Sequence, residues 1–408
     1  MTRPNWPRLD RSRFALVAGL AIDNYGSGLF LPLALVYATR VVDLAVDTAG
    51  TVVAAASVLG FAVPPIAGRL THRLGPRAVV VTSQLLQASG ALAYLLAGDA
   101  VGVFVAAALL AAGTQLFYCS VFVLVADVST DTAKERPFAL IQMVRAGSFG
   151  LGTLTGALLL SWGSDTALRW LVGLDAATFV VAAVLLATLV TTEPVDHETA
   201  HRVGPLTVLR DRPYLALMAA VCLVDLADFA LVGMPIFVIE VVDGPAWLPG
   251  ALLATGTAMV SLGGVRVVDA LRGVRRTRSM QSAAATYAVW GILMMAMLWI
   301  PAGWLIPYAF AIGVLRVAAG LAFFPIAGAL SEALPPTQRR AGYMSTYQYA
   351  FTTAQAVAPA VVALFAVASW LPWAVVAACS LAATAVIGWL GRTIPATSNR
   401  AAAPVTVA

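Results

Sequence analysis

The feature that most constrains this chain is a series of apolar blocks, each about twenty residues long, separated mostly by short polar segments. A helix of that length crosses a hydrocarbon core of about 30 Å. Only 11% of the residues are charged and 60% are hydrophobic, whereas a soluble protein needs roughly a quarter of its residues charged. The pattern therefore predicts an all-α integral membrane protein whose main partner is the lipid bilayer.

Twelve transmembrane helices are expected, and most connections are short enough to make neighbouring helices antiparallel. The block that begins at Phe14 lacks a small-residue cleavage site followed by a soluble domain, so we interpret it as a retained first span. The expected spans lie at about 14–37, 48–68, 78–97, 101–126, 138–162, 168–191, 214–240, 246–269, 280–299, 303–331, 341–366 and 371–391.

Basic residues fall unevenly on the two sides of the predicted membrane. If the N-terminus is cytoplasmic, the cytoplasmic side receives nearly all of them, and the outer side receives only Arg40 and Arg169. The excess of Lys and Arg in cytoplasmic loops predicts that both termini are cytoplasmic. The bias towards Ala, Val and Arg is typical of a high-GC bacterial genome, so we expect a multi-pass protein of the bacterial cytoplasmic membrane.

The long polar connection at about 192–213 divides the spans into six plus six. We expect an N-terminal six-helix bundle over 1–192, a cytoplasmic linker over 193–213, a C-terminal bundle over 214–392 and a disordered cytoplasmic tail over 393–408. Similar features recur in the two halves at a common interval, such as Asp23 with Asp225. Internal repeats of this kind are typical of secondary transporters, in which substrate sits between halves that alternate its access to the two sides.

The segment between the second and third spans reads Gly68-Arg69-Leu70-Thr71-His72-Arg73-Leu74-Gly75-Pro76-Arg77. It resembles the G-x-L-x-D-R-x-G-R-K loop of the major facilitator superfamily, with a histidine where that family usually has Asp. The resemblance covers essentially the whole chain and implies twelve helices in two pseudo-symmetric six-helix bundles. It also implies a cytoplasmic gating loop formed by Gly68, His72, Arg73, Gly75, Arg77 and Asp127, with Asp127 as a partner of Arg73.

Other stretches resemble the bacterial drug-efflux-like branch, which consists of drug:proton antiporters. The fifth span is rich in glycine, and small residues at such spacing let helices approach closely. The opening stretch from Asp23 to Pro32 resembles first spans of the same branch, and the stretch from Arg316 to Gly320 is similar to the family's arginine motif. The glycines of the fifth span are Gly147, Gly150, Gly152 and Gly156.

Ionisable side chains near helix centres are costly and usually functional or paired. Asp23 lies about ten residues into the first span, hence about 15 Å deep. Asp225 lies at a similar depth in the seventh span, and Asp228 follows three residues later on nearly the same face. Two carboxylates that close disfavour joint ionisation, which suits a carrier that loads and releases a proton. We expect Asp23, Asp225, Asp228, Arg316 and Arg145 to serve proton coupling or substrate binding.

Static Asp–Arg pairs that tie helices together are the alternative for each of these charges. Arg145 lies near the cytoplasmic end and could also snorkel to the interface, and Asp175 could be a contact residue of the sixth span. Aromatic and polar side chains at helix centres can line a substrate cavity, although packing between helices also accounts for them. These cavity candidates are Asn24, Tyr25, Gln115, Tyr118, Gln142, Phe229, Tyr347 and Gln355.

The leading hypothesis is a secondary active transporter that couples proton entry to efflux of small hydrophobic or amphipathic compounds. The alternative is a proton-coupled transporter of a polar metabolite such as a sugar or amino acid. A receptor or scaffold would need an extra soluble domain or a long tail. We expect no enzyme and no cofactor, because the sequence has no nucleophile elbow, phosphate-binding loop or metal-ligand cluster. The expected partners are the bilayer, a small-molecule substrate and protons, not nucleic acid, and the expected state is a monomer.

Overall fold

The structure is a computed structural model that describes residues 11–128, 135–160, 165–191, 208, 210–229, 233–234, 236–245, 247–271, 273–336 and 339–400. All regular secondary structure in these residues is helical. The chain divides into two compact units. Unit 1 comprises Met1–Thr130, Val144–Arg202 and Thr337–Thr346, and unit 2 comprises Asp131–Met143, Val203–Pro336 and Tyr347–Ala408.

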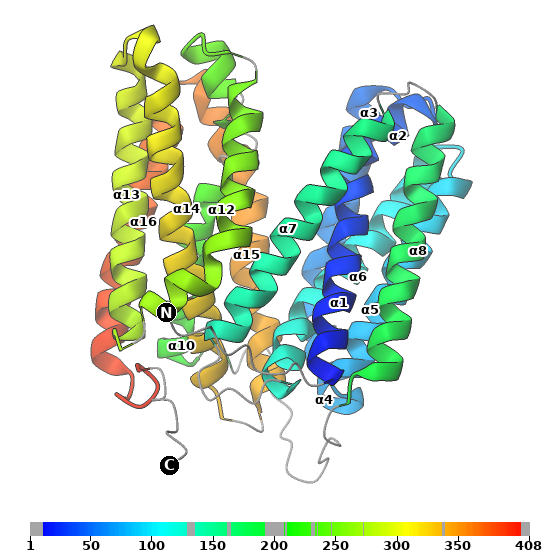
Figure 1. Ribbon diagram of the computed structural model, residues 1–408, viewed down its shortest axis with the longest axis horizontal. Helices are drawn as coiled ribbons and strands as arrows, with labels where there is room; N and C mark the ends of the chain where they lie inside the picture. The colour runs from blue at the N-terminus through cyan, green and yellow to red at the C-terminus, as the bar shows by residue number, and fades with distance from the viewer. Residues whose placement is uncertain are drawn as a thin grey trace, which may run out of the picture. The chain divides into compact units, whose positions relative to one another are not determined.

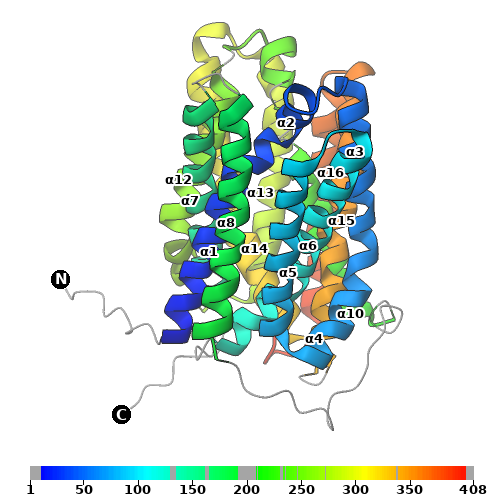
Figure 2. The same ribbon diagram turned by 90° about the vertical axis from the view of Figure 1, so that its right-hand side faces the viewer.

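Unit 1 contains a bundle in which α5 packs between α6 and α8, while α1 packs along α8 (Figure 1). The helix α3 lies against α6, as the side view shows (Figure 2). Its helices are α1 (Arg11–Phe30), α2 (Ala34–Arg40), α3 (Val46–Val58), α4 (Val63–Leu74), α5 (Pro76–Leu96), α6 (Ala100–Val128), most of α7 (Glu135–Leu160) and α8 (Asp165–Leu189). Short 3-10 turns at Leu31–Leu33 and Leu59–Ala62 join α1 to α2 and α3 to α4.

Glycines allow α1 and α7 to approach backbone to backbone. A Cβ atom on Gly152 would lie 2.0 Å from the carbonyl oxygen of Tyr25, and one on Gly156 would lie 2.7 Å from that of Leu29. A Cβ on Gly28 would lie 2.2 Å from the carbonyl oxygen of Phe149. No real side chain tolerates such distances, so the glycine spacing of α7 serves close helix packing, as small residues do in membranes.

Unit 2 is organised around α13, which packs against both α14 and α16 (Figure 1). The helix α10 lies against α16, and α12 lies against α14. Its helices are α10 (Arg212–Asp225), α12 (Leu248–Ala270), α13 (Arg276–Ala296), α14 (Ala302–Ala333), most of α15 (Arg340–Ala363) and α16 (Leu371–Thr393). Short turns occur at Leu226–Phe229, Phe237–Val241, Met297–Trp299 and Leu364–Ala366.

Each unit includes the first turns of one helix whose remainder belongs to the other unit. The start of α7 belongs to unit 2, where Phe138 lies next to Gly328 and Met143 lies next to Gly264. The start of α15 belongs to unit 1, where Ser345 lies next to Gly68. Helix α7 passes from one unit to the other after Met143, and α15 does so after Thr346. These two positions are about one interval of the sequence repeat apart, so the two halves share this arrangement.

Ten of the described helical segments are long and apolar enough to cross a membrane, and α7 adds another helix of 26 residues. The expected seventh span, 214–240, is not one continuous α-helix. The helix α10 ends at Asp225, a 3-10 turn covers Leu226–Phe229, and Phe237–Val241 has π-helical hydrogen bonding. The sequence of this region contains Gly233 and Pro235, and both residue types weaken a continuous helix.

The expected loop over 68–77 is also different in the structure. The helix α4 continues to Leu74, and α5 begins at Pro76, so Gly75 alone separates them. Gly75 adopts a φ of 80°, which an L-residue rarely adopts, and its N–H donates to the carbonyl oxygen of Thr71 at 3.0 Å. A glycine followed by a helix-starting proline therefore makes the turn without a loop.

Large apolar side chains cover much of the outer surface of the helices. Leu154 of α7 is 59% exposed and Leu381 of α16 is 55% exposed, while Trp170 of α8 and Trp299 after α13 are about three-quarters exposed. Contiguous apolar surface of this extent is unfavourable in water and suits a lipid environment. The molecule is therefore a multi-pass membrane protein built from helices.

Candidate functional site

Buried and half-buried polar side chains from five helices of unit 1 form the candidate site. Two come from neighbouring positions on α1, and each of the others comes from a different helix. We call this set the polar cluster; its members are Asp23, Asn24, Gln84, Tyr118, Arg145 and Asp175. Burial of polar groups in an apolar bundle is costly, which makes the cluster the best candidate for function.

Two carboxylates, Asp23 of α1 and Asp175 of α8, interact electrostatically within the cluster. Asp23 is 5% exposed and Asp175 is 2% exposed. Gly26 permits their approach, because a Cβ atom at that position would lie 2.8 Å from Oδ1 of Asp175. The Oδ1 atom of Asp175 makes no hydrogen bond within the described part of the chain. Since two buried negative charges repel each other, this pair is suited to holding a proton.

Gln84 of α5 lies next to Asp23 and is fully buried. Neither its amide oxygen nor its amide nitrogen makes a hydrogen bond of normal geometry to any described residue. A buried amide whose donor and acceptor atoms are poorly satisfied costs free energy. The position of this amide beside the carboxylate of Asp23 favours a role in which Gln84 hydrogen-bonds to a ligand that enters the site.

Arg145 of α7 connects the acidic pair to aromatic side chains of α6. Its Nε donates to Oδ1 of Asn24 at 3.2 Å, and Nδ2 of Asn24 donates to Oδ2 of Asp23 at 3.0 Å. Another guanidinium nitrogen, Nη2, donates to the hydroxyl of Tyr118, whose ring centroid lies 4.7 Å from Cζ of Arg145. The side chain of Arg145 therefore points into the bundle rather than snorkelling, and its charge also gains cation–π stabilisation.

Unit 2 has its own buried acid and its own aromatic cluster. Asp225, at the end of α10, is 7% exposed and interacts electrostatically with Tyr347 of α15. The ring of Tyr347 packs edge-on against the rings of Tyr214 and Phe351, with centroids 6.4 Å and 5.5 Å away. Cζ of Arg316 lies 5.7 Å from the ring centroid of Trp290 on α13. Unit 2 therefore places a carboxylate beside the rings around Tyr347 and, in a separate contact, an arginine over the ring of Trp290.

The remaining predicted cavity residues are placed as follows. Tyr25 and Gln142 are half-buried on α1 and α7, and Gln355 is exposed on α15. Gln115 is half-buried on α6, and its Cγ packs near Gly60. Asp228 and Phe229 belong to the turn after α10, but their side chains lie outside the described residues.

The predicted gating residues occupy the ends of α4, α5 and α6. His72 and Arg73 lie in the last turn of α4, where positive charge complements the helix dipole. Arg77 of α5 donates to the carbonyl oxygens of Leu186 and Ala187 on α8, and thereby joins the ends of those helices. Asp127 is exposed near the end of α6. Its pairing with Arg73 stays a prediction.

The polar cluster contains two residues that the sequence analysis did not select as site candidates. Asp175 stands out in sequence as a lone charge in an apolar block, but its position alone does not identify Asp23 as its neighbour. Gln84 had a weaker signal, the run of polar residues Ser83, Gln84 and Gln87 in an otherwise apolar span. That run faces the interior, since all three side chains are buried.

A multi-pass bundle of apolar helices with buried charged groups is typical of membrane transport proteins. The family description of the Major Facilitator Superfamily matches residues 16–315. The chain therefore belongs to the major facilitator superfamily, whose members are transporters.

Solved structures of several transporters resemble the protein. The human organic anion transporter MFSD10 (TETRAN) aligns with a TM-score of 0.74 at 15% identity, covering 94% of this chain and 100% of its own. A bacterial homologue of the iron transporter ferroportin, in an outward-facing state, has a TM-score of 0.71 at 14% identity, with coverages of 93% and 99%. The E. coli fucose:proton symporter FucP has a TM-score of 0.73 at 16% identity, with coverages of 92% and 98%.

These identities are low, so the likeness to solved structures shows the fold alone. A comparison with curated protein sequences finds no match. The substrate therefore has to be inferred from the residues of this chain.

Proposed function

We propose that the protein is a proton-coupled secondary active transporter that exports small hydrophobic or amphipathic compounds by alternating access. The observation that carries proton coupling is the buried pair of carboxylates, Asp23 and Asp175, beside Gln84. A proton bound by this pair removes one buried negative charge, so loading and release of the proton change the free energy of the site.

Arg145 supports this proposal because it is connected to Asp23 through Asn24. Protonation of the acidic pair removes the negative charge that stabilises the guanidinium. The Arg145 side chain, held by Tyr118 and Asn24, then gains freedom to interact with other groups. Proton binding and substrate binding can be coupled in this way through a single hydrogen-bonded chain.

The aromatic groups support an amphipathic substrate. Tyr214, Tyr347 and Phe351 form a connected set of rings in unit 2 next to the buried Asp225. Aromatic faces beside a carboxylate suit a hydrophobic compound that carries a positive charge. The glycine-rich α7 and the start of α1 resemble the drug-efflux-like branch, which adds to the support for export.

A polar metabolite is the second candidate substrate. Arg145 and Asn24 offer hydrogen-bond donors and acceptors of the kind that bind sugars or carboxylates. Two of the solved relatives are named for an organic anion and for fucose with protons. Loss of binding of one polar compound on replacement of Arg145, with no transport of hydrophobic cations, would favour this candidate.

We also propose that the protein lies in a bacterial cytoplasmic membrane with both termini in the cytoplasm, as a monomer. The support is the uneven distribution of arginines, because Arg40 and Arg169 fall on one predicted side of the membrane and nearly all the other arginines fall on the opposite side. Cysteine introduced beside Arg169 should react with an impermeant reagent added to whole cells, and cysteine beside Arg275 should not. The reverse labelling would overturn this orientation.

The direct test uses purified protein in liposomes with an imposed pH gradient. A screen of fluorescent hydrophobic cations, sugars and amino acids should find a substrate whose movement is driven by that gradient. Expulsion of a hydrophobic cation against proton entry supports the first candidate, and proton-driven movement of a polar compound supports the second. Transport that is indifferent to the gradient would overturn proton coupling.

A further inference from the structure

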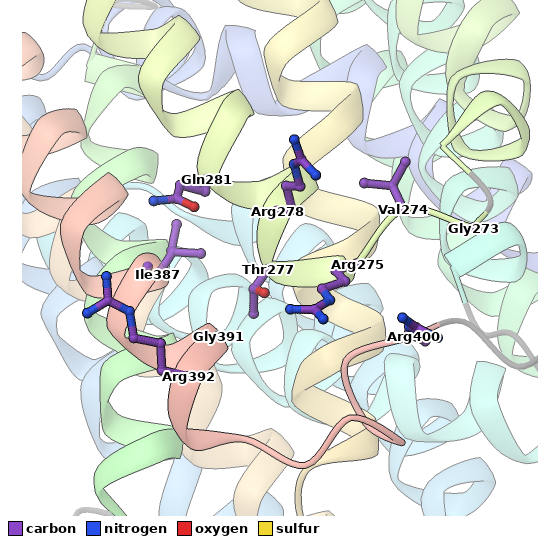
Figure 3. A pocket seen from close by; sticks show the side chains of 11 residues that line it. Gly273, Val274, Arg275, Thr277, Arg278, Gln281, Ile387, Gly391, Arg392 and Arg400 are labelled. Carbon is purple, nitrogen blue, oxygen red and sulfur yellow. The ribbon is translucent and has the colours of Figure 1, made fainter.

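A basic pocket lies at one end of unit 2, away from the residues discussed for transport. It has a volume of about 610 Å³ and is lined by the start of α13, the end of α16 and the segment that follows α16 (Figure 3). Four arginines line it: Arg275, Arg278, Arg392 and Arg400. Among the described residues no carboxylate lines this pocket. Its walls are therefore strongly attractive to anions.

The C-terminal segment is held in place by hydrogen bonds to α13. Backbone N–H of Arg276 donates to the carbonyl oxygen of Asn399 at 2.9 Å, and Nη1 of Arg276 donates to that of Ser398 at 2.9 Å. Oδ1 of Asn399 accepts from the N–H and the hydroxyl of Thr277, each at 3.0 Å. These bonds bring Arg400, within the expected C-terminal tail, to the pocket from a third segment of the chain.

Two glycines set the separation of α13 and α16 at this end. A Cβ atom on Gly388 would lie 2.8 Å from Nε2 of Gln281, and one on Gly391 would lie 2.7 Å from Oγ1 of Thr277. The hydroxyl and amide therefore sit at the pocket wall with the arginines around them. Gln281 and Thr277 are among the lining residues, so hydrogen-bonding groups accompany the positive charges.

The start of α13 adds to the attraction for an anion. The positive end of the helix dipole lies at Arg276, and the first turn contains no acidic residue that would neutralise it. The neighbouring arginine, Arg276, is committed elsewhere, since its Nε donates to Oε1 of Glu135 at 2.5 Å. The charges left for a ligand are those of the four arginines that line the pocket.

The faces that lead away from the pocket carry exposed apolar side chains. On α13, Val289 and Ile292 lie at helical spacings that place them on the face of Arg278, and they are 48% and 50% exposed. On α16, Leu381 lies on the face of Arg392 and is 55% exposed. A ligand with a phosphate in the pocket and hydrocarbon chains along these faces would satisfy both surfaces at once.

We propose that this pocket binds phosphate as the headgroup of an anionic membrane phospholipid. Arginine forks match phosphate oxygens in geometry as well as charge. Basic pockets between transmembrane helices are known to hold lipid headgroups. The lipid thereby joins α13, α16 and the C-terminal segment, which all contribute arginines. Free phosphate would bind the same arginines, but it would leave the exposed apolar side chains of α13 and α16 uncovered.

The test titrates full-length protein in neutral detergent with phosphatidylglycerol and follows binding by native mass spectrometry. Phosphatidylcholine is the zwitterionic comparison, and inorganic phosphate and glycerol 3-phosphate are the soluble comparisons. Phosphatidylglycerol should bind more tightly than phosphatidylcholine, and neither soluble phosphate should displace it. Displacement by inorganic phosphate would show a free-anion site and overturn the lipid assignment, and equal binding of both lipids would overturn the preference for an anionic headgroup and with it the proposal.

The test variant changes Arg275, Arg278 and Arg392 to Gln. Its affinity for phosphatidylglycerol should fall by about 100-fold, or about fivefold for each arginine. The control variant changes Arg210, Arg212 and Arg266 to Gln, which removes the same charge from exposed positions of unit 2 outside the pocket. Its affinity should stay within about twofold. An equal loss in both variants would show unspecific attraction and overturn the proposal.

A single charge reversal gives a second measurement if the triple variant does not fold. Arg278→Glu changes one exposed side chain, and Arg266→Glu is its control on α12. Phosphatidylglycerol binding should weaken with the first substitution and change little with the second. Unchanged binding in folded Arg278→Glu protein would overturn the proposal.

Discussion

Oε1 of Glu135, at the start of α7, accepts a hydrogen bond of 2.5 Å from Nε of Arg276, at the start of α13, and both side chains are 7% exposed. This is a buried, charge-assisted pair within unit 2. It attaches the first turns of α7 to the helix that organises that unit. A second pair from the same region, Arg136 with Asp269, is longer at 3.9 Å and is more than a third exposed on each side.

Removing one partner of the buried pair should destabilise the protein strongly. Glu135→Gln leaves the Arg276 charge buried without its counter-charge, and breaking a buried pair in this way costs about 3–5 kcal/mol. Asp269→Asn, the control, disrupts the exposed pair and should cost less than about 1 kcal/mol. Thermal unfolding of both variants in detergent measures the difference. Equal shifts in Tm would show that burial does not strengthen the first pair.

Proton coupling should depend on the acidic pair of unit 1. Asp23→Asn places a neutral side chain of similar shape beside Asp175, so the repulsion between two carboxylates that favours proton binding is removed. We expect substrate exchange down its own gradient to persist while transport driven by a pH gradient is lost. Asp175→Asn should have the same effect. In proteoliposomes, a pH-sensitive dye inside measures proton movement, and the flux of labelled substrate measures exchange.

The dependence on pH follows from the same pair. In the proposed antiport, lowering the pH outside should speed export by the native protein, whereas the rate of Asp23→Asn should not respond. Asp99→Asn is the control, because Asp99 is exposed and its Oδ1 accepts from the N–H of Gly102 at 2.8 Å. A native-like pH response in Asp23→Asn would remove Asp23 from the coupling mechanism.

The shape of Arg145 should matter as much as its charge. Arg145→Lys keeps a positive charge but loses the planar group that bonds Asn24 and Tyr118 and lies over the Tyr118 ring. We expect substrate affinity to fall by about tenfold, which corresponds to one charge-assisted hydrogen bond of about 1.4 kcal/mol. Binding to purified protein, measured by fluorescence or calorimetry, checks this.

Tyr118→Phe separates the two contributions of the tyrosine. This substitution keeps the aromatic face and removes the hydroxyl that accepts from Arg145. Its effect on affinity should be smaller than that of Arg145→Lys. If Arg145→Lys binds substrate like the native protein, the cluster positions α7 without recognising a ligand.

The sequence predicted the helical fold well because spanning a membrane demands long apolar blocks, which are easily seen. Charges such as Asp23 and Arg145 could be selected as candidates for the same reason, since they stand out in those blocks. The neighbours of each charge were harder to predict. A helix that is apolar on every side has no polar face from which its packing can be deduced, so nothing in sequence placed Asp175 or Gln84 beside Asp23.

Turn and packing details were also beyond the sequence pattern. The motif around Gly75 was expected to form a loop, but the φ of 80° at that one residue is enough to separate α4 from α5. The interruption after Asp225 was missed because hydropathy reports the length of an apolar block and not its backbone hydrogen bonding. Glycine spacing in α7 did predict close approach of another helix, and the structure identifies α1 as that helix.

Close packing of α7 on α1 gives the last prediction. In Gly152→Ala the new Cβ would lie 2.0 Å from the carbonyl oxygen of Tyr25 and 3.1 Å from Cα of Gly28, and both neighbours are backbone atoms. The helices must separate, at a cost of about 1–3 kcal/mol. Gly173→Ala in α8 is the matched control, because its Cβ would meet nothing within 4 Å. That control should keep or raise stability by about 0.5–1 kcal/mol, since alanine favours helix more than glycine does. Thermal unfolding of the two variants should therefore shift Tm in opposite directions, and a common shift would mean that α1 and α7 do not depend on this contact.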